Sequence, residues 1–511
     1  MSQRVSIWTR IRVAASLFFG LRKPDFQAAG VYVKQRFGQH GFFGRWFRFI
    51  GWALYQMWVV IPNSSRDLTI AEIVSRTPMW LIDENPLTNH PWKEDSNAQL
   101  PEEAVEVVVI GAGFTGAAAA YHWSTRARAK RLVVLEMGDP ASGSSGRNEG
   151  LVVMGRYFKM VRDTVHQWLV DVRPDLTTKK RDGLACQFAE QYCRAAYRNA
   201  DLIEQTIETE GFDCNYSRSG WVQARTLKEQ EALVKSVQMA DDFDCRDWTS
   251  IDPAEVKERT GMNVEHNAGF SIAAASWHPA KWVWCLLQKS LEQPNVQLFT
   301  QTRVKSVTLD EKSQIYRVRT SRGDVFARNI IYATESYTPK LHGEFHDAIL
   351  PIQEQAASGD GGPETMKPHV GISGTYFFAG RYGPRVLFGS GGSRLPDDEA
   401  GRNLPSRFLT RYVAAEMKHA YGPYQLHMEN EWSGTVGYTP DEYPIVGRID
   451  GNRYIVAGMC GSGSGVSFNG ARCVVNRILD RDEQDDYPEE YFAPSRLLNP
   501  AKHNWPAIGE E

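Results

Sequence analysis

The sequence predicts an α/β fold built around a parallel sheet, joined to a second domain of α+β type and preceded by a helical N-terminal extension. Three observations predict it. Residues 105–136 hold a strand, a glycine turn, a helix and a second strand in succession. Residues 454–479 follow the order strand, glycine turn, helix near the other end of the chain. Residues 1–100 are instead basic and aromatic-rich. Strands that alternate with helices are typical of a parallel sheet covered by helices.

The first glycine turn has residue types and a spacing that suit a bound pyrophosphate. An apolar run of strand type, Val105 to Ile110, leads directly into Gly111-Ala112-Gly113-Phe114-Thr115-Gly116. Its first glycine permits the tight turn, its second lets a pyrophosphate approach the backbone, and its third lets helix and strand pack closely. Glu136 ends the next strand, where a carboxylate accepts hydrogen bonds from a ribose. The unit predicts a Rossmann-type dinucleotide site, for either NAD or FAD.

Two further glycine-rich segments favour the longer dinucleotide. Ser142 to Gly150 is dense in small residues, which let the backbone approach a flat ligand without collision. Gly458 to Val466 leads into a helix, whose free N–H groups and positive end stabilise negative charge on a reduced flavin. An NAD enzyme has no evident use for either segment, so we expect FAD.

Composition excludes several other classes of protein. The chain has 511 residues, of which 42% are hydrophobic and 23% charged, enough for two domains or more. Its net charge of −3 gives no basic field for nucleic acid. The seven cysteines are scattered without a CxxC or Cys/His spacing, so we expect a reducing compartment and no metal.

The N-terminal extension needs its own interpretation. Residues 1–50 hold nine Lys or Arg and one acid, and residues 1–23 are acid-free, as in a transit peptide. The uncharged stretch 49–61 is shorter than the ~20 residues that span a bilayer. Residues 1–61 are therefore either an anchor on a membrane surface or a helical arm packed on this protein or a partner subunit, and we favour the arm. We expect a cytoplasmic protein, peripheral to a membrane in the anchor interpretation, or else a mitochondrial matrix protein. The anchor would rest on Trp46, Phe47, Trp52 and Trp58.

Several spaced motifs identify a family. Over residues 104–480 the chain resembles the FAD-dependent D-amino-acid oxidase-like superfamily, in its glycine oxidase and sarcosine oxidase group. It looks most similar to gamma-glutamylputrescine oxidase-type enzymes. Besides the first and last glycine turns, the motifs are Ser145-Gly146-Arg147-Asn148, Leu350-Pro351, Trp432-Ser433-Gly434, Thr439-Pro440-Asp441 and Pro444-Ile445-Val446-Gly447.

The resemblance implies a division of the chain. Residues 1–100 form the extension and 483–511 a tail. The FAD-binding domain takes residues 104–160, 279–340 and 432–482, and the substrate domain takes residues 161–278 and 341–431.

The resemblance also implies a set of FAD contacts. Val304 lies where the family holds the adenine through its backbone, and Ala333-Thr334 matches a conserved turn in which Glu335 here replaces a glycine. The full predicted set is Gly111, Gly113, Phe114, Thr115, Gly116, Glu136, Met137, Ser144, Ser145, Arg147, Asn148, Glu149, Gly150, Val304, Ala333, Thr334, Gly434, Gly461, Ser462, Gly463, Ser464, Gly465 and Val466.

Departures from the family narrow the chemistry. Gly434 and Arg147 stand where relatives tether FAD through a cysteine or a histidine, so we expect non-covalent FAD. Val436 stands where an arginine clamps the substrate carboxylate, so either the substrate has no such carboxylate or Arg381 or Arg156 binds it.

Four residues are candidates for catalysis, each with a structural alternative. His278 is either a base facing the substrate or a packed, capping histidine. Trp432 and Tyr438, with Phe377 and Phe378, form either an aromatic wall around a cationic amine or part of the core. Arg381 is either a substrate ligand or a surface charge.

The resemblance implies an enzyme that oxidises an amine C–H bond by hydride transfer to flavin N5, giving an imine that water hydrolyses. Two alternatives stay open. One is a membrane-associated dehydrogenase that passes electrons to a quinone or carrier protein. The other is a flavoprotein subunit with a structural role in a larger complex.

Overall fold

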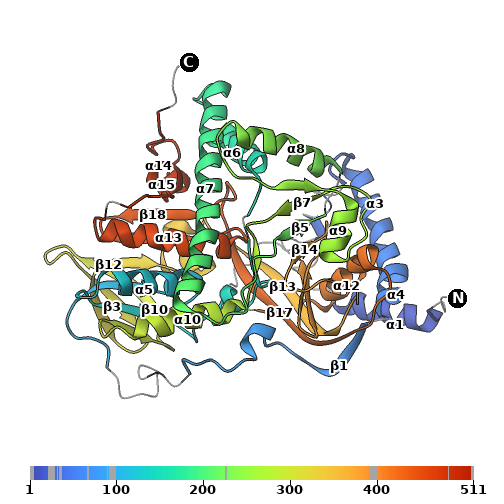
Figure 1. Cartoon of the computed structure of the whole chain (residues 1–511), viewed down its shortest axis with the longest axis horizontal. Helices are drawn as coiled ribbons and strands as arrows, with labels where there is room; N and C mark the ends of the chain where they lie inside the picture. The colour runs from blue at the N-terminus through green and yellow to red at the C-terminus, as the bar shows by residue number, and fades with distance from the viewer. Residues whose placement is uncertain are drawn as a thin grey trace.

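Two large sheets and a long central helix organise the protein (Figure 1). The computed structural model describes residues 5–20, 29, 30, 33, 37–65, 68–88, 90, 99–153, 155–224, 227–390, 401, 403–481 and 483–507. An eight-stranded sheet lies on the left of the view and a nine-stranded sheet on the right. Helix α7 (Thr178–Glu210) runs between them.

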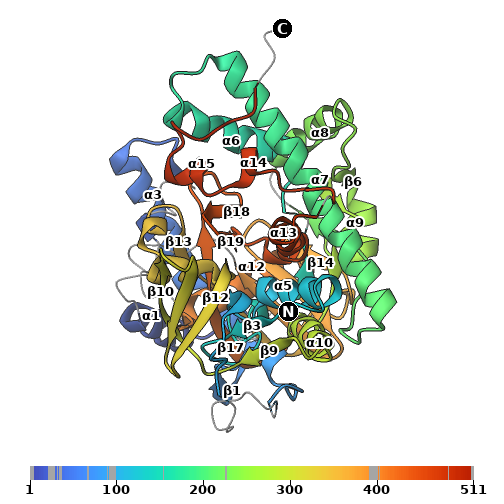
Figure 2. The same ribbon diagram turned by 90° about the vertical axis from the view of Figure 1, so that its left-hand side faces the viewer.

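The eight-stranded sheet confirms the predicted α/β fold. β2 is parallel to β3 and β12, β3 is parallel to β9, and β12 is parallel to β19, so the carboxyl ends of these strands share one edge. The apolar run that predicted β2 is buried because helices α5, α10 and α13 pack on one face (Figure 2) and a second apolar cluster packs on the other. The strands are β2 (Val105–Ile110), β3 (Leu132–Leu135), β9 (Val296–Phe299), β10 (Val304–Asp310), β11 (Ile315–Thr320), β12 (Asp324–Tyr332), β18 (Ile445–Asp450) and β19 (Arg453–Ala457), and the helices are α5 (Phe114–Arg126), α10 (Pro279–Leu291) and α13 (Gly463–Ile478).

The nine-stranded sheet has the order β1-β17-β13-β16-β15-β14-β5-β7-β6. Its longest pairing is antiparallel, between β13 (Leu350–Gly361) and β17 (Leu426–Tyr438). β17 carries Trp432 to Tyr438 into this sheet, although the predicted boundary at 432 assigns them to the FAD-binding domain. The other strands are β1 (Leu68–Ser75), β5 (Trp221–Gln223), β6 (Thr249–Ile251), β7 (Ala268–Ser271), β14 (Gly371–Ser373), β15 (Phe378–Tyr382) and β16 (Arg385–Ser390).

The N-terminal extension is helical at first, as predicted, and then joins the second sheet. Helices α1 (Ile7–Gly20), α3 (Phe42–Tyr55) and α4 (Ile61–Ser65), with a π-helical turn at Gln56–Val60, lie at the edge of the molecule in Figure 1. β1 then pairs in parallel with β17. Among the described residues, no helix has the length and apolar character needed to cross a membrane. The basic residues Arg4, Arg22, Lys23, Lys34 and Arg36 lie outside the described residues.

The C-terminal tail packs into the core. Arg496 Nε donates to Asp441 Oδ2 at 2.7 Å, and both side chains are fully buried. The tail therefore braces the Thr439-Pro440-Asp441 segment. The remaining elements are the short strands β4 (Leu151–Val152) and β8 (Ala275–Ser276), the helices α6 (Phe158–Val172), α8 (Leu227–Asp241), α9 (Pro253–Thr260), α11 (Thr338–Leu341), α12 (Arg407–Tyr421), α14 (Glu489–Phe492) and α15 (Ser495–Leu498), and 3₁₀ turns at Met79–Leu81, Ser144–Gly146, Glu335–Tyr337 and Gly343–Phe345.

Candidate active site

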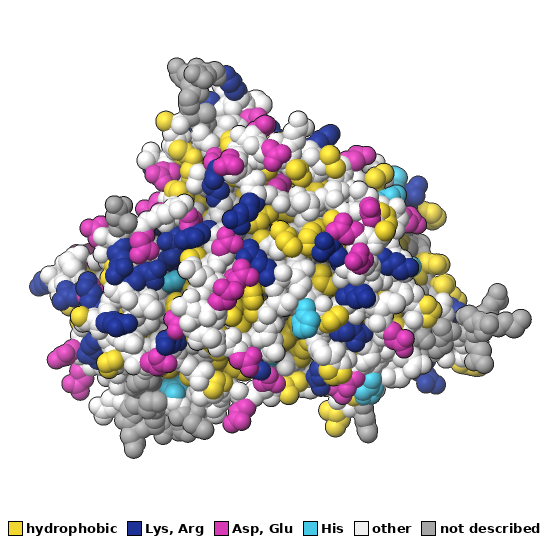
Figure 3. Space-filling model, in the orientation of Figure 1, with side chains coloured by type: hydrophobic (Ala, Val, Ile, Leu, Met, Phe, Trp, Pro, Cys, Tyr) yellow, Lys and Arg dark blue, Asp and Glu magenta, His cyan; other side chains and the backbone are white. Residues whose placement is uncertain are grey.

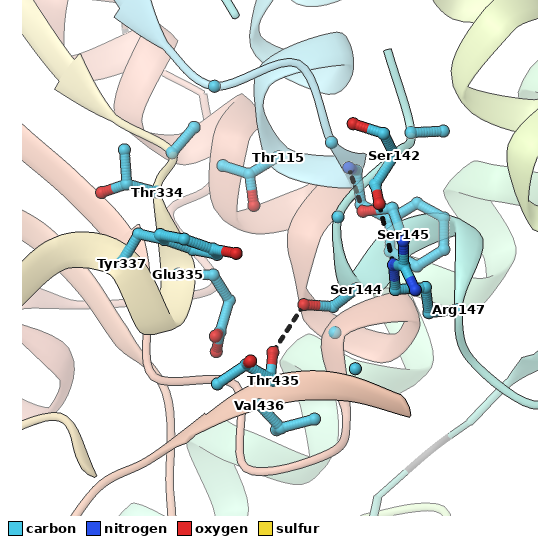
Figure 4. Close-up of a pocket in the computed structure, with 18 of the residues that line it drawn as sticks. Thr115, Ser142, Ser144, Ser145, Arg147, Thr334, Glu335, Tyr337, Thr435 and Val436 are labelled. Carbon is cyan, nitrogen blue, oxygen red and sulfur yellow. Dashed lines mark hydrogen bonds between the residues drawn. The ribbon is translucent and has the colours of Figure 1, made fainter. Parts of the chain in front are cut away.

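A cavity of about 1000 Å³ opens where the carboxyl ends of β2, β3 and β12 meet, and it extends to β13 and β17 of the second sheet. Ligands of open α/β sheets bind outside this edge. Gly113 and Gly463, from the two distant glycine turns, both line the cavity. Figure 4 shows Thr334, Glu335 and Tyr337 on one wall and Ser144, Ser145 and Arg147 on the other.

The first glycine turn has no room for side chains. Gly111 has a φ of +107°, and a Cβ there would lie 2.5 Å from the carbonyl oxygen of Ala333. A Cβ on Gly116 would lie 1.8 Å from the carbonyl oxygen of Gly111, so only glycine lets α5 start this close to β2. The start of α5 then faces the cavity through Gly113 and Thr115, where N–H groups and the positive end of the helix favour a phosphate.

Glu136 ends β3 at the cavity wall. Its carboxylate accepts the N–H groups of Ala112 at 2.7 Å and Gly138 at 2.8 Å, which fixes its orientation. Burial raises the pKa of this carboxyl group above its ordinary value. Val304 lines the cavity nearby, so the ribose and adenine end of a dinucleotide has both of its predicted contacts available.

The serine-rich loop, residues 142–148, is hydrogen-bonded to β17. Ser144 Oγ donates to the carbonyl oxygen of Thr435 at 2.7 Å (Figure 4). Arg147 donates from Nε to the Ser142 carbonyl at 2.9 Å and from Nη1 to the Ser433 carbonyl at 3.1 Å. Its stem packs on Gly434, where a Cβ would lie 3.2 Å from that of Arg147. Arg147 thus holds the loop with backbone hydrogen bonds.

The second glycine turn is more open. Gly461 and Gly463 line the cavity, and a Cβ on Gly463 would find no atom closer than 3.8 Å. Gly465 lies behind them and is needed for packing, because its Cβ would lie 2.0 Å from the carbonyl oxygen of Val153. The turn therefore presents backbone to the cavity at the start of α13, at the end opposite Glu136.

Glu335, the residue that replaces a family glycine, joins three elements. It adopts a φ of +47° at the end of β12. Its carboxylate accepts the N–H groups of Gly437 at 2.8 Å, from β17, and Met459 at 2.9 Å, after β19. Burial raises its pKa. From the sequence, Glu335 was recognised only as a replacement for an expected glycine, and nothing local predicted its hydrogen bonds to Gly437 and Met459.

The predicted catalytic residues are not all at the cavity. Trp432 is fully buried and donates from Nε1 to the Arg147 carbonyl at 2.9 Å. Arg381 donates to the carbonyls of Met366 and Pro363, at 3.1 and 2.6 Å, away from the described lining. Tyr438 lies just behind the lining and donates to Glu354 Oε1 at 2.6 Å. These positions give Trp432 and Arg381 supporting contacts in place of the predicted contact with substrate.

His278 has the geometry of the capping alternative. Its Nδ1 accepts the N–H of Lys281 at 3.2 Å at the start of α10, and its Nε2 lies 3.3 Å from Asp83 Oδ2. Burial lowers its pKa to about 4, so the ring is neutral near pH 7. It is absent from the described lining of the cavity.

Arg156 and Arg381, the two candidates for binding a substrate carboxylate, both interact with other groups of the protein. Arg156, like Arg381, is missing from the described lining and is ion-paired with Glu442. Val436, assigned from the sequence to the position of the arginine clamp, lines the cavity with an apolar side chain. Phe378 also lines it, whereas Phe377 packs in the core.

Most predicted FAD contacts line the cavity, and a few lie just behind it. Gly116, Gly150, Ser462, Gly465 and Val466 are missing from its described lining and instead shape or pack the turns. Sequence reasoning missed Arg303, Tyr337, Lys340, Glu354 and Thr435, because their approach depends on long-range pairing of strands. Those that line it are Gly111, Gly113, Phe114, Thr115, Glu136, Met137, Ser144, Ser145, Arg147, Asn148, Glu149, Val304, Ala333, Thr334, Gly434, Gly461, Gly463 and Ser464.

These features fit an elongated dinucleotide. A bare glycine cradle and a helix N-terminus stand at one end, and a second helix N-terminus stands at the other. The volume lies at the upper end of the range for ligand sites in proteins.

Comparison with known proteins identifies the family. The model for the FAD dependent oxidoreductase family, DAO, matches residues 106–477. The chain is 24% identical over 409 residues to the probable oxidoreductase OrdL of Haemophilus influenzae, covering 77% of this chain and 87% of that protein. It is 23% identical to the gamma-glutamylputrescine oxidoreductase of Escherichia coli, covering 75% and 85%. Among solved structures, glycine oxidase from Geobacillus kaustophilus superposes with a TM-score of 0.60 at 16% identity, covering 77% of this chain and 99% of that one. The protein therefore belongs to the DAO family of FAD dependent oxidoreductases.

Proposed function

We propose that this protein oxidises an amine at the C–H bond next to nitrogen, with FAD bound non-covalently across the cavity. One observation carries the proposal: the two glycine turns, which are separated by most of the chain, line the same cavity. The names of two relatives, a gamma-glutamylputrescine oxidoreductase and a glycine oxidase, support an amine or amino-acid substrate. Bound FAD supplies the acceptor for the hydride, and the imine product is hydrolysed by water.

The absence of suitable tethers supports non-covalent binding. Gly434 and Arg147 have no side chain that could form a link to flavin. Cys460, which lies within the second turn, accepts the N–H of Thr439 at 3.3 Å, and burial raises its pKa to about 12. A thiol that stays protonated is a poor nucleophile, so Cys460 is a packed side chain in this proposal.

Residues of the chain bind FAD, orient the reacting groups and shield them from water. Glu136 accepts hydrogen bonds from the ribose, and the N–H groups of α5 receive the pyrophosphate. Arg147 and Glu335 hold the serine-rich loop and the second turn by backbone hydrogen bonds, so the reacting groups meet in a fixed geometry. The apolar side chains of Val436 and Phe378 help to exclude water from the site.

A visible absorption spectrum of the purified protein, titrated anaerobically with a panel of amines, tests the proposal. We expect flavin bands that bleach with at least one amine, and yellow supernatant over a colourless pellet after acid precipitation. Peroxide formation in air then separates an oxidase from a dehydrogenase. A protein that takes up no FAD contradicts the proposal. A flavoprotein that no amine reduces but that binds a partner supports the structural alternative.

We also infer that the helices of the N-terminal extension rest on an anionic membrane surface, as the dehydrogenase alternative requires. None of the 14 residues of α3 is buried, and Phe43 and Phe47 are 86% and 81% exposed. On α1, Trp8 is 74% exposed. Figure 3 shows hydrophobic side chains along the right-hand edge of the molecule, the side on which α1 and α3 lie in Figure 1. A packed arm would bury them, whereas a lipid headgroup region receives aromatic side chains. The exposed Arg12 and Arg48 complement anionic lipid.

Sedimentation with vesicles tests this inference. We expect the full chain to bind vesicles that contain phosphatidylserine and not those of phosphatidylcholine alone. A Phe43→Ser/Phe47→Ser variant should lose binding, while Leu309→Ser, which removes an exposed apolar side chain from β10, should keep it. If the full chain binds neither type of vesicle but dimerises through Phe43 and Phe47, the membrane inference is refuted and these side chains contact a protein partner instead.

A further inference from the structure

Two carboxylates from different elements line the part of the cavity nearest the second sheet. Glu149 follows the serine-rich loop, and its backbone carbonyl accepts the hydroxyl of Tyr382 at 2.8 Å. Glu354 lies on β13 directly opposite Gly434 of β17, and its Oε1 accepts the hydroxyl of Tyr438. Tyr382 therefore holds the backbone at Glu149, Tyr438 holds the carboxylate of Glu354, and the two side chains line the same part of the cavity.

The cationic side chains of the described lining are directed elsewhere. Arg303, Lys305 and Lys340 lie at or beside β10, at the ribose and adenine end. Arg147 lies near the carboxylates, but two of its N–H groups donate to backbone carbonyls. Among the described lining residues, this end of the cavity therefore offers carboxylates and no cationic clamp, which suits a cation better than a carboxylate.

The environment of the Glu149 carboxyl group also favours a positively charged ligand. Burial, the larger cause, and the nearby charge of Glu354 together raise the pKa of Glu149 to about 8. Within the described part of the chain, no side chain donates a hydrogen bond to its carboxyl group. A positive ligand between the two carboxylates would remove their repulsion and stabilise both charges.

We propose that Glu149 and Glu354 bind a second, non-reacting ammonium group of the substrate, which is therefore a diamine with no carboxylate beside its reacting carbon. The inference rests on the proposed amine oxidation and names its substrate class. The bound nitrogen is the non-reacting one because a carboxylate pair stabilises an ammonium ion, whereas the nitrogen beside the broken C–H bond must be neutral. Val436, in place of a cationic clamp, is consistent with this substrate.

Equilibrium binding to the FAD-loaded protein tests the inference without turnover. Calorimetry at pH 8 would compare 1,4-diaminobutane, butylamine and 4-aminobutanoate, with FAD content measured for every variant. We expect 1,4-diaminobutane to bind most tightly. Glu354→Gln and Glu149→Gln should each weaken it by about 10- to 100-fold and leave butylamine within about twofold. Glu311→Gln, at an exposed turn, is the matched control.

The pH profile gives a second readout. Since Glu149 must lose its proton to receive the ammonium group, affinity for 1,4-diaminobutane should rise by up to about tenfold per pH unit from pH 6 to pH 8 and then level off. In Glu149→Gln this contribution should disappear, so that the ratio of the affinities for 1,4-diaminobutane and butylamine stays constant over this range.

Three outcomes distinguish failure of the carboxylate site from failure of the proposed amine oxidation. Equal binding of diamine and monoamine, or Gln variants that bind 1,4-diaminobutane like the parent protein, would overturn the inference and leave amine oxidation standing. Tight, Glu-dependent binding of a diamine to a flavin that no amine reduces would refute the proposed oxidation and leave the carboxylate site standing. If Glu149→Gln loses FAD, Glu354→Gln alone decides the inference.

Discussion

The two glycine turns have similar sequences but different physical reasons for their glycines. In the first turn, a Cβ on Gly111 or Gly116 would meet backbone atoms at 2.5 and 1.8 Å. In the second, a Cβ on Gly465 would meet backbone at 2.0 Å and Gly458 and Gly461 have positive φ, but a Cβ on Gly463 would find no atom closer than 3.8 Å. Backbone packing therefore requires the glycines Gly111 and Gly116 of the first turn, whereas Gly463 is a position of the second turn where the protein itself leaves room and a ligand can use it.

The second turn also depends on support from far along the chain. Asp441 accepts the Thr439 hydroxyl at 2.9 Å, and the methyl group of that threonine packs against Gly458. Removing the guanidinium with Arg496→Ala leaves Asp441 charged and buried, so we expect the free energy of unfolding to fall by about 3–5 kcal/mol. Urea denaturation measures it. Arg317→Ala, which breaks the exposed pair with Asp324, should cost under about 1 kcal/mol. Similar losses in the two variants would contradict this account.

Gly116→Ala should break the first turn. The added methyl group must push backbone apart, so we expect a loss of about 3 kcal/mol or more of unfolding free energy, or no folded protein. Expression level and thermal unfolding report this. A variant that folds and keeps FAD like the parent would show that the turn is looser than its contacts indicate.

Glu335→Ala should loosen the second turn selectively. It frees two N–H groups, those of Gly437 and Met459, and we expect a loss of about 2–3 kcal/mol of unfolding free energy together with faster FAD release. FAD fluorescence after dilution measures the release. If the variant is less stable but releases FAD at the same rate as the parent, Glu335 contributes to folding and not to FAD binding.

Glu136 makes the first turn sensitive to pH. Because burial raises its pKa, this carboxyl group takes up a proton at a higher pH than an ordinary glutamate. Its ability to accept hydrogen bonds from a ribose is lost as pH falls through that raised value, so FAD affinity should decline in mild acid, by up to about tenfold per pH unit. Glu136→Gln should bind FAD more weakly at pH 7 and lose this dependence. Parallel pH profiles for parent and variant would exclude Glu136 as the cause.

Gly463→Ala should have the smallest effect. The new methyl group would make only ordinary contacts with Met459 and Phe114, at 3.8 and 3.9 Å. We expect the free energy of unfolding to change by less than about 0.5 kcal/mol. A large loss would mean that the second turn is as tightly packed as the first.

The comparison also explains which features the sequence predicted. The first turn was predictable because its determinants are local: a strand, three spaced glycines and Glu136 fall within one short segment. The confirmed family and α/β fold followed from this turn and from motifs in the expected order.

What sequence reasoning missed depends on contacts between distant segments. Trp80 donates to the Asn148 carbonyl at 2.8 Å, and Glu354 reaches the cavity through the register of β13 with β17. Nothing local to Trp80 or Glu354 indicates these neighbours. Contacts between distant segments also explain why two residues expected at the cavity lie away from it. Arg381 and Trp432 lie near site motifs in sequence, but the strands direct their side chains to backbone carbonyls.

If the two turns hold opposite ends of one FAD, Gly463→Leu should weaken the binding of FAD and not that of ADP, and the dissociation constants of both ligands for its apoprotein measure this. Gly463 lines the cavity, so a leucine there adds bulk at the proposed flavin end, while ADP needs only the first turn and Glu136. We predict that FAD binds at least about tenfold more weakly than to the parent apoprotein, with ADP affinity unchanged. Unchanged FAD affinity, or an equal loss for both ligands, would contradict the account.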